Sequence, residues 1–154
     1  MSDSIRIIDI NDASGIVIAG NWLASAESVH RQLRPQLPED YAGTMRRVFA
    51  GGGRMCVAEM GEAVAGVAVY RIHENTFDGV QMYVDDLVTD AARRSRGVGK
   101  ALLDHLQQIA RDAGCKAFTL DSGTQRQQAH KFYFREGMVV TSFHFGKAIP
   151  PRSA

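Results

Sequence analysis

The hydrophobic pattern of the first fifty residues predicts one short strand followed by two helices. Residues 5–8 form an apolar run of strand length. Residues 11–25 carry apolar side chains at roughly helical spacing, with Asn11 or Asp12 in position to cap the helix. Helical spacing resumes over 39–49 and stops at three consecutive glycines. We therefore expect a β-α-α beginning.

From residue 54 the apolar period changes to two. The segments 54–60 and 63–72 are predicted strands, and the dipeptide Gly61-Glu62 between them predicts a tight hairpin turn. Residues 80–89 alternate in the same way and predict a third strand of this meander.

The last third of the chain alternates between helical and strand patterns. Residues 97–113 predict an amphipathic helix, 116–121 a short strand, 124–136 a second amphipathic helix, and 138–145 a final alternating strand. A meander followed by strand–helix–strand predicts an α/β (α+β) fold. We expect a mixed, mostly antiparallel twisted sheet with a central parallel strand pair and flanking helices.

Composition narrows the class of protein. With 45% hydrophobic and 23% charged residues, the chain reads as one globular domain over 1–149 with a flexible tail over 150–154. A net charge of +1 provides no basic field for nucleic acid or an anionic membrane, and no segment is apolar enough to span one. The beginning of the chain lacks the pattern of a signal peptide, and Cys56 and Cys115 form no CxxC pair. A cytoplasmic location is expected.

The stretch Arg94-Ser95-Arg96-Gly97-Val98-Gly99-Lys100 precedes the helix predicted over 97–113. The start of a helix has unsatisfied N–H groups and a partial positive charge, which together favour an anion. The two glycines let an anion approach the backbone, and the three cations add positive charge. A plain glycine-containing turn with solvated cations remains the structural alternative.

Two common phosphate motifs do not fit this stretch. A Walker loop needs glycine where the chain has Arg94 and a hydroxyl residue where it has Ala101. A dinucleotide fingerprint needs a third glycine where the chain has Leu102. A pyrophosphate such as that of coenzyme A remains the better candidate ligand.

Two motifs resemble those of the GCN5-related N-acetyltransferases (GNAT). Arg94-x-x-Gly97-x-Gly99 resembles their motif A, Arg/Gln-x-x-Gly-x-Gly/Ala, and residues 129–138, AHKFYFREGM, resemble their Ala-x-x-Phe-Tyr-x-x-x-Gly-Phe segment. The resemblance covers about 54–147, and its end looks most like the aminoalkylphosphonate N-acetyltransferase branch. It implies a single-domain GNAT fold and an acyl-CoA N-acyltransferase with acetyl-CoA as donor.

The resemblance also implies which residues bind the donor. Backbone amides of the loop would hold the pyrophosphate, and the amide of Leu87 or Val88 would face the thioester oxygen. Arg126 stands where many relatives have an asparagine for the pantetheine arm. It could reach a phosphate or an anionic acceptor group, or be a solvated cation. The predicted cofactor-binding residues are Leu87, Val88, Arg94, Ser95, Arg96, Gly97, Val98, Gly99, Lys100 and Arg126.

Acetyl transfer to an amine needs a proton acceptor for the amine and a proton donor for the departing thiolate. The resemblance implies Tyr133 as the donor, with a core aromatic as the alternative. It implies Asp85 as a water-mediated base, with a structural or substrate-binding acid as the alternative. Because consecutive strand residues face opposite ways, Asp86 is expected on the other face, and a β-bulge would change that assignment.

The other reactive side chains are expected to be structural. His130 and His144 read as surface or structural residues, and both cysteines as small buried hydrophobes. No His, Cys and Asp cluster has metal-ligand spacing, so no metal is predicted.

The expected function is direct transfer of an acetyl group from acetyl-CoA to a primary amine of a small molecule or peptide. A catalytically silent acyl-CoA sensor is the first alternative, and a nucleotide-binding module is the second. No motif identifies the acceptor in 11–49 or 72–79, although His73, Glu74 and Asp78 could contact an amine. The expected partners are acetyl-CoA and the acceptor, with no nucleic acid or membrane; a homodimer is possible.

Overall fold

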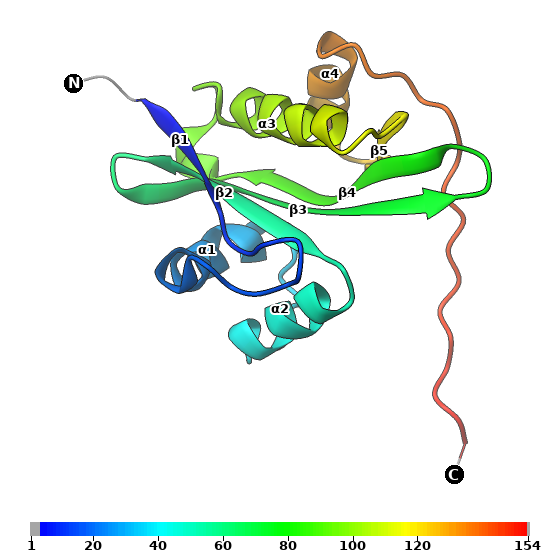
Figure 1. Ribbon diagram of the computed structural model, residues 1–154, viewed down its shortest axis with the longest axis horizontal. Helices are drawn as coiled ribbons and strands as arrows, with labels where there is room; N and C mark the ends of the chain where they lie inside the picture. Colours follow the sequence, from blue (N-terminus) through cyan, green and yellow to red (C-terminus); the bar gives the residue numbers. More distant parts are fainter. Residues whose placement is uncertain (1–3, 154) are drawn as a thin grey trace. The chain divides into compact units, whose positions relative to one another are not determined.

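The computed structural model describes residues 4–153. The first three residues and Ala154, which ends the expected tail, lie outside the described residues. The chain divides into two compact units, one up to Leu120 and one from Asp121 onward. The elements are β1 (Ile5–Asp9), α1 (Gly20–Leu33), α2 (Tyr41–Ala50), β2 (Arg54–Met60), β3 (Ala63–Asn75), β4 (Gly79–Thr89), the 3-10 turn η1 (Ala91–Arg93), α3 (Val98–Asp112), β5 (Ala117–Leu120) and α4 (Gln127–Arg135) (Figure 1).

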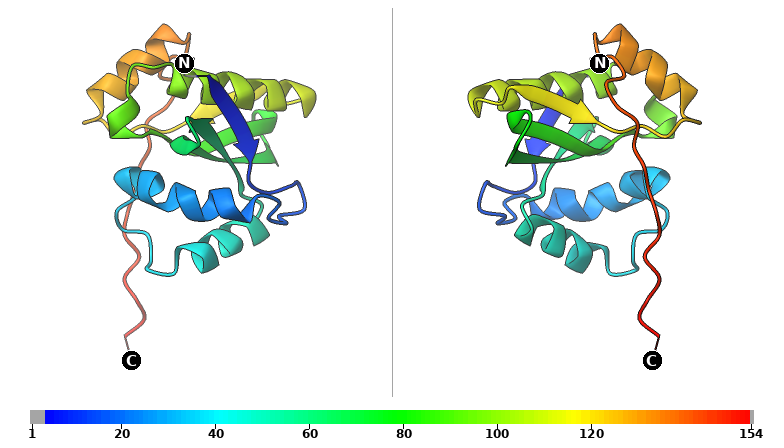
Figure 2. Two further views of the ribbon diagram at one scale, coloured as in Figure 1. Left: turned by 90° about the vertical axis from the view of Figure 1, so that its left-hand side faces the viewer. Right: turned by 90° about the vertical axis from the view of Figure 1, so that its right-hand side faces the viewer.

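The first unit is a five-stranded sheet between two layers of helices. The strands run in the order β1-β2-β3-β4-β5, antiparallel except for the parallel pair β4–β5. Helices α1 and α2 cover one face and α3 covers the other, as both views in Figure 2 show. The predicted fold class, a mixed and mostly antiparallel sheet with flanking helices, is confirmed.

The period-two pattern of β2 and β3 places alternate side chains on the two faces of the sheet. The face toward α1 and α2 builds one core cluster, in which strand valines and Met55 pack against the apolar sides of both helices. Its buried members include Leu23, Ala26, Val29, Tyr41, Met45, Phe49, Met55, Val57, Val67 and Val69.

The opposite face receives the apolar side of α3. Buried Val98, Leu102, Leu103 and Leu106 recur at the three- and four-residue spacing of an amphipathic helix and point toward the sheet. This helix therefore begins beside the strands, with the loop that precedes it held next to β4.

The helix predicted over 11–25 begins later than expected. The Asp12 carboxylate accepts hydrogen bonds from the amides of Ser14 (2.9 Å) and Ile16 (3.0 Å), which folds a turn there. The Asn11 side chain bonds instead to backbone groups of Gly53 and Met55. The prediction that either residue caps the helix is wrong, because both side chains stabilise the connection between β1 and α1.

The second unit contains α4 and an extended C-terminal segment. The predicted strand over 138–145 is wrong as a secondary-structure assignment, because residues 138–153 have no regular structure. Figure 1 shows them, in orange to red, as an extended trace after α4. A strand needs a neighbouring strand for its N–H and C=O groups, and an alternating pattern does not reveal which chain provides it.

Candidate functional site

The glycine loop ends at the N-terminus of α3. Gly97 is the N-cap residue, with φ +84° in the left-handed region, and no side chain caps the helix. Ser95 also has a positive φ of 64°. Alternating left-handed residues make a concave arrangement of backbone N–H groups, and the helix dipole adds positive charge at the same point. The loop therefore offers a site for an anion.

Gly66 on β3 lets α3 begin close to the sheet. A Cβ atom at Gly66 would lie 2.6 Å from Val98 Cγ1 and 2.9 Å from Leu102 Cδ1. Since Gly66 pairs with Thr89 at the end of β4, this close approach positions the loop beside that strand end. Sequence reasoning missed Gly66, although a lone glycine inside an apolar strand is a signal of close packing.

Strands β4 and β5 separate before β4 ends. Their pairing runs from Gln81 with Ala117 to Val84 with Leu120, whereas β4 continues to Thr89. Within residues 4–120, the edge of β4 that faces β5 therefore has no strand paired with it after Val84. The predicted amides of Leu87 and Val88 lie on this stretch, and because consecutive strand amides point to opposite sides, one of them faces the opening. An extended ligand arm could pair there.

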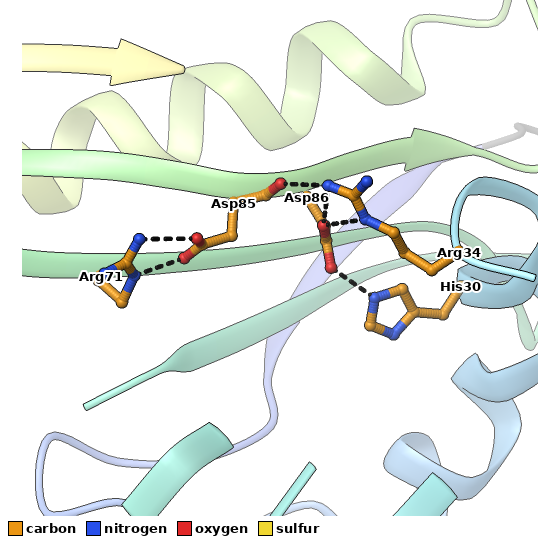
Figure 3. A network of polar contacts seen from close by, with 5 residues as sticks. All are labelled: His30, Arg34, Arg71, Asp85 and Asp86. Atoms are coloured by element: carbon orange, nitrogen blue, oxygen red, sulfur yellow. Dashed lines mark hydrogen bonds and ion pairs between the residues drawn. The ribbon is translucent and has the colours of Figure 1, made fainter. Parts of the chain in front are cut away.

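A β-bulge lies within the acidic pair of β4. Val69 on β3 pairs with Asp86 and the next residue, Tyr70, pairs with Val84, so Asp85 is the extra residue on β4. The expectation that the two carboxylates point to opposite faces is wrong, because the bulge breaks the alternation. Both are held on the face that α1 covers (Figure 3).

Asp85 is paired with Arg71 on the adjacent strand β3. The guanidinium donates from Nε and Nη2 to the two carboxylate oxygens, each at 2.8 Å. The side chains are 31% and 45% exposed for Asp85 and Arg71 respectively, so water reaches this pair. The hydrogen bond with Asp85 raises the pKa of Arg71.

Asp86 is more buried and is bound by two residues of the first helix segment. His30 Nε2 lies 2.7 Å from Oδ2, and Arg34 Nε donates to Oδ1 at 2.7 Å (Figure 3). Arg34 also donates to the backbone oxygen of Asp85 at 2.9 Å. Burial alone would raise the pKa of Asp86, but the hydrogen bonds from His30 and Arg34 outweigh it and hold the pKa below its usual range.

Tyr41 extends this network into the core. His30 is fully buried, and its Nδ1 lies 2.8 Å from the Tyr41 hydroxyl. Since a carboxylate can only accept, Nε2 is the nitrogen that donates to Asp86. Burial raises the pKa of Tyr41. Sequence reasoning missed His30, Arg34 and Tyr41, because they lie far from β4 in the chain and match no motif.

The second unit holds the remaining predicted residues. Tyr133 is buried in α4, and Arg126, at the N-cap position of that helix, hydrogen-bonds it. Burial raises the pKa of Tyr133, and this outweighs the opposite effect of the Arg126 charge and hydrogen bond. His130 Nε2 lies 2.8 Å from the Gly123 carbonyl, and His144 forms an ion pair with Asp121 at 3.2 Å.

One His, Cys and Asp group appears only in three dimensions. Candidate ligand atoms of Asp9, Cys56 and His105 lie within 4.8 Å of one another, although the residues come from β1, β2 and α3. Burial raises the pKa of Cys56, which keeps the thiol protonated, and His105 pairs with Asp9 at 3.2 Å. The positive charge of Arg54 also acts on Asp9 and Cys56. The carboxylate of Asp9 is therefore paired with His105, while the neighbouring thiol of Cys56 stays neutral.

A family model described as the acetyltransferase (GNAT) family matches residues 21–138. The chain belongs to this family. The match includes the glycine loop, the acidic pair and α4. It confirms the resemblance carried by the two sequence motifs.

Two curated relatives are similar over part of their length. An uncharacterized N-acetyltransferase of Bacillus subtilis (strain 168) is 43% identical over 72 residues, which cover 46% of this chain and 51% of the relative. The aminoalkylphosphonate N-acetyltransferase of Salmonella typhimurium is 30% identical over 92 residues, 58% of each protein. The chain therefore spans about half the length of these relatives.

A solved structure has the same fold. The aminoglycoside N-acetyltransferase AAC(6')-Iy in complex with CoA is similar with a TM-score of 0.81, covering 97% of each chain at 17% identity. Within 4–153, none of the helices has the length and apolarity required to cross a membrane.

Proposed function

We propose that this protein transfers an acetyl group from acetyl-CoA to a primary amine of a small molecule or peptide. The observation that carries the proposal is the uncapped start of α3 at Gly97, which lies beside the opening between β4 and β5. Few ligands need an anion site and an unpaired strand edge together. A pyrophosphate joined to an extended amide-containing arm, as in coenzyme A, matches both.

Donor binding would use mainly backbone groups. The loop from Arg94 to Lys100 binds the pyrophosphate through the amides around Gly97, and its cations add long-range attraction. The outward amide of Leu87 or Val88 binds the thioester oxygen and stabilises the negative charge that develops there. Arg126 is kept as a donor-binding residue, and its hydrogen bond to Tyr133 links it to the proposed acid.

The reaction requires one bond exchange and two proton transfers. The amine nitrogen bonds to the thioester carbonyl carbon, the carbon–sulfur bond breaks, and the sulfur takes the electron pair. Tyr133 supplies the proton for the thiolate, consistent with burial that raises its pKa and keeps the phenol protonated at neutral pH. Asp85 accepts the amine proton through water, consistent with its partly exposed carboxylate, and Arg71 fixes the orientation of that carboxylate.

The acceptor class is drawn from the printed names of similar proteins and from the partly exposed carboxylate of Asp85. One relative is an aminoalkylphosphonate N-acetyltransferase, and one neighbour with the same fold is an aminoglycoside N-acetyltransferase. Both classes present a primary amine on a small polar molecule. The proposal retains the cytoplasm as the location and neither nucleic acid nor membrane as a partner; it allows a homodimer without requiring one.

The decisive experiment measures donor binding and turnover separately. Calorimetry with coenzyme A, ATP and NAD should show binding of coenzyme A alone. Thiol release from acetyl-CoA should then accelerate with at least one member of a panel of aminoalkylphosphonates, aminoglycosides, polyamines and peptides. Coenzyme A binding without amine-dependent thiol release across the panel would favour the silent sensor. Binding of ATP or NAD instead would overturn the proposal.

A further inference from the structure

Three potential metal ligands meet on the face of the sheet that α3 covers. Asp9, the last residue of β1, pairs directly with Cys56 on β2, so both side chains lie on the same face of the sheet. His105 on α3, the helix packed against both strands, reaches the same point. The candidate ligand atoms of the three residues all lie within 4.8 Å of one another. All three residues belong to the first compact unit, so the cluster is complete within it.

The distances in the cluster are close to those of a tetrahedral metal site. His105 Nε2 lies 3.2 Å from Asp9 Oδ1. In a tetrahedral zinc site, nitrogen and oxygen ligands at about 2.0–2.2 Å from the metal lie about 3.4 Å apart, and a thiolate at about 2.3 Å lies about 3.6 Å from each of them. The imidazole and the carboxylate are therefore already at the right separation, and a small movement of the Cys56 side chain completes the arrangement.

The types of ligand select the class of metal. Thiolate and imidazole together are ligands of zinc and related transition metals, whereas Mg²⁺ and Ca²⁺ take oxygen ligands. Three protein ligands leave the fourth tetrahedral position for water or hydroxide. Cys56 is fully buried, while the side chains of Asp9 and His105 are 43% and 30% exposed. An ion from solvent can therefore meet the carboxylate and the imidazole first and the sulfur beneath them.

The charges around the cluster fit an ion that carries a hydroxide. A divalent ion is neutralised by one thiolate and one carboxylate, and Arg54, whose charge acts on both Asp9 and Cys56, adds one positive charge. A hydroxide in the fourth position would bring the sum to zero, and a bound zinc ion makes hydroxide accessible near neutral pH. Arg54 Nε is buried and has no hydrogen-bond partner within residues 4–153, so it is an unsatisfied donor beside the cluster.

We propose that Asp9, Cys56 and His105 bind one zinc ion, with water or hydroxide as the fourth ligand. On binding, the S–H bond of Cys56 breaks, the sulfur keeps the electron pair and bonds to the ion, and the proton goes to solvent. His105 binds through Nε2, and its ring proton is then carried on Nδ1. The ion ties α3 to β1 and β2, and therefore stabilises the helix whose start carries the glycine loop.

The site is tested with Zn²⁺ and Co²⁺ on the full chain without an affinity tag. Bound metal is first removed with a chelator, and Zn²⁺ is then titrated in competition with a chromophoric chelator. One equivalent should bind, and an excess of Mg²⁺ should not displace it. Co²⁺ should give the charge-transfer absorption of a cobalt–thiolate bond. Calorimetry in buffers of different ionisation enthalpy should show the release of about one proton per Zn²⁺, that of the thiol.

Three variants each remove one ligand. Cys56→Ala, His105→Asn and Asp9→Asn should each weaken Zn²⁺ binding at least about tenfold, because loss of even an outer-shell partner costs about 10–100-fold in affinity. The cobalt–thiolate absorption should disappear in Cys56→Ala. Circular dichroism checks that the variants fold. His105→Asn and Asp9→Asn change partly exposed side chains, so they still test the site if Cys56→Ala does not fold.

The matched controls remove the same groups elsewhere in the first unit. Cys115→Ala removes the other free cysteine, His73→Asn an exposed imidazole and Asp112→Asn an exposed carboxylate. All three should bind Zn²⁺ as the wild type does, and Cys115→Ala should keep the cobalt–thiolate absorption. In thermal unfolding, Zn²⁺ should raise the Tm of the wild type and leave that of His105→Asn unchanged.

Three outcomes would overturn the zinc site. The wild-type chain could fail to bind one equivalent of Zn²⁺, binding could be unchanged in Cys56→Ala or His105→Asn, or the cobalt–thiolate absorption could depend on Cys115 instead. None of the three proposed ligands belongs to the glycine loop, the acidic pair or α4. Metal binding and acetyl transfer are therefore measured separately, and the two proposals can fail separately.

Discussion

His30 on α1 and Asp86 on β4 are joined by a 2.7 Å contact between Nε2 and Oδ2, although 56 positions separate them in the sequence. Together with Arg34, this contact fixes the bulged part of β4 against the first helix. Of the two adjacent carboxylates on β4, this contact involves the more buried one, that of Asp86. Asp85 remains at the surface, where an acceptor could reach it.

The His30–Asp86 contact should make stability depend on pH. The folded pKa of Asp86 lies below its unfolded value of about 3.9, so its stabilisation is complete well above pH 4 and is lost as the pH falls through the folded pKa. Asp86→Asn should lower the free energy of unfolding by about 1–3 kcal/mol at pH 7. The difference in unfolding free energy between the variant and wild type should be smaller at pH 3. Urea unfolding at pH 7 and at pH 3 measures this difference. An equal difference at the two pH values would contradict a stabilising role of the Asp86 carboxylate.

Asp85→Asn should affect turnover more than folding. Its carboxylate is the proposed water-mediated base, and general bases contribute about 10²–10⁴-fold. We expect kcat to fall at least about tenfold with an unchanged dissociation constant for coenzyme A. Asp112→Asn removes an exposed carboxylate at the end of α3 and should retain full activity. If Asp85→Asn kept the wild-type turnover rate, Asp85 would not be the base.

Tyr133→Phe should lower turnover well over tenfold while acetyl-CoA binding barely changes, because only the proton donor is lost. Stopped-flow thiol release measures the turnover rate, and calorimetry measures the affinity for acetyl-CoA. Tyr70→Phe is the matched control, since it removes the hydroxyl of another buried tyrosine. A rate for Tyr133→Phe equal to that of this control would leave the thiolate without an assigned acid.

Gly97→Ala should weaken coenzyme A binding by about tenfold, the cost of roughly one charge-assisted hydrogen bond. The added methyl group has open space, since no neighbouring atom lies within 4 Å of it. However, a φ of +84° is strained for any residue with a Cβ, and relief of this strain would tilt the amides of the loop. Gly114→Ala introduces similar strain at φ +74°, also in open space, at the far end of α3. Both variants should lose similar stability, and only Gly97→Ala should lose affinity.

Gly66→Ala should destabilise the fold and the donor site together. The new methyl group would meet Val98 and Leu102, and overpacking of this kind costs about 1–3 kcal/mol. Because Val98 is the first residue of α3, the helix start must move away from Gly66 on β3. Thermal unfolding should show a lower stability, and calorimetry should show a lower affinity for coenzyme A. An unchanged affinity for coenzyme A would show that the position of the helix start does not matter for donor binding.

Local patterns identified most elements of the fold. The predicted hairpin around Gly61-Glu62 and the helix after Gly97 match β2–β3 and α3 closely, because periodicity and turn residues act over a few positions. The helix predicted from Asn11 began too early, since its polar side chains bond to distant backbone and to a local turn. The strand predicted over 138–145 failed because its partner is not encoded in its own pattern.

The sequence by itself determined the family and indicated the proposed anion-binding loop and the candidate acid at Tyr133, because these depend on short motifs with fixed spacing. Only the tertiary structure decided which aspartate is buried. The bulge at Asp85 arises from the pairing of β3 with β4, and His30 and Arg34 reach Asp86 only after α1 packs on the sheet. Contacts of this kind depend on register and packing over long separations, which no local pattern of residues contains.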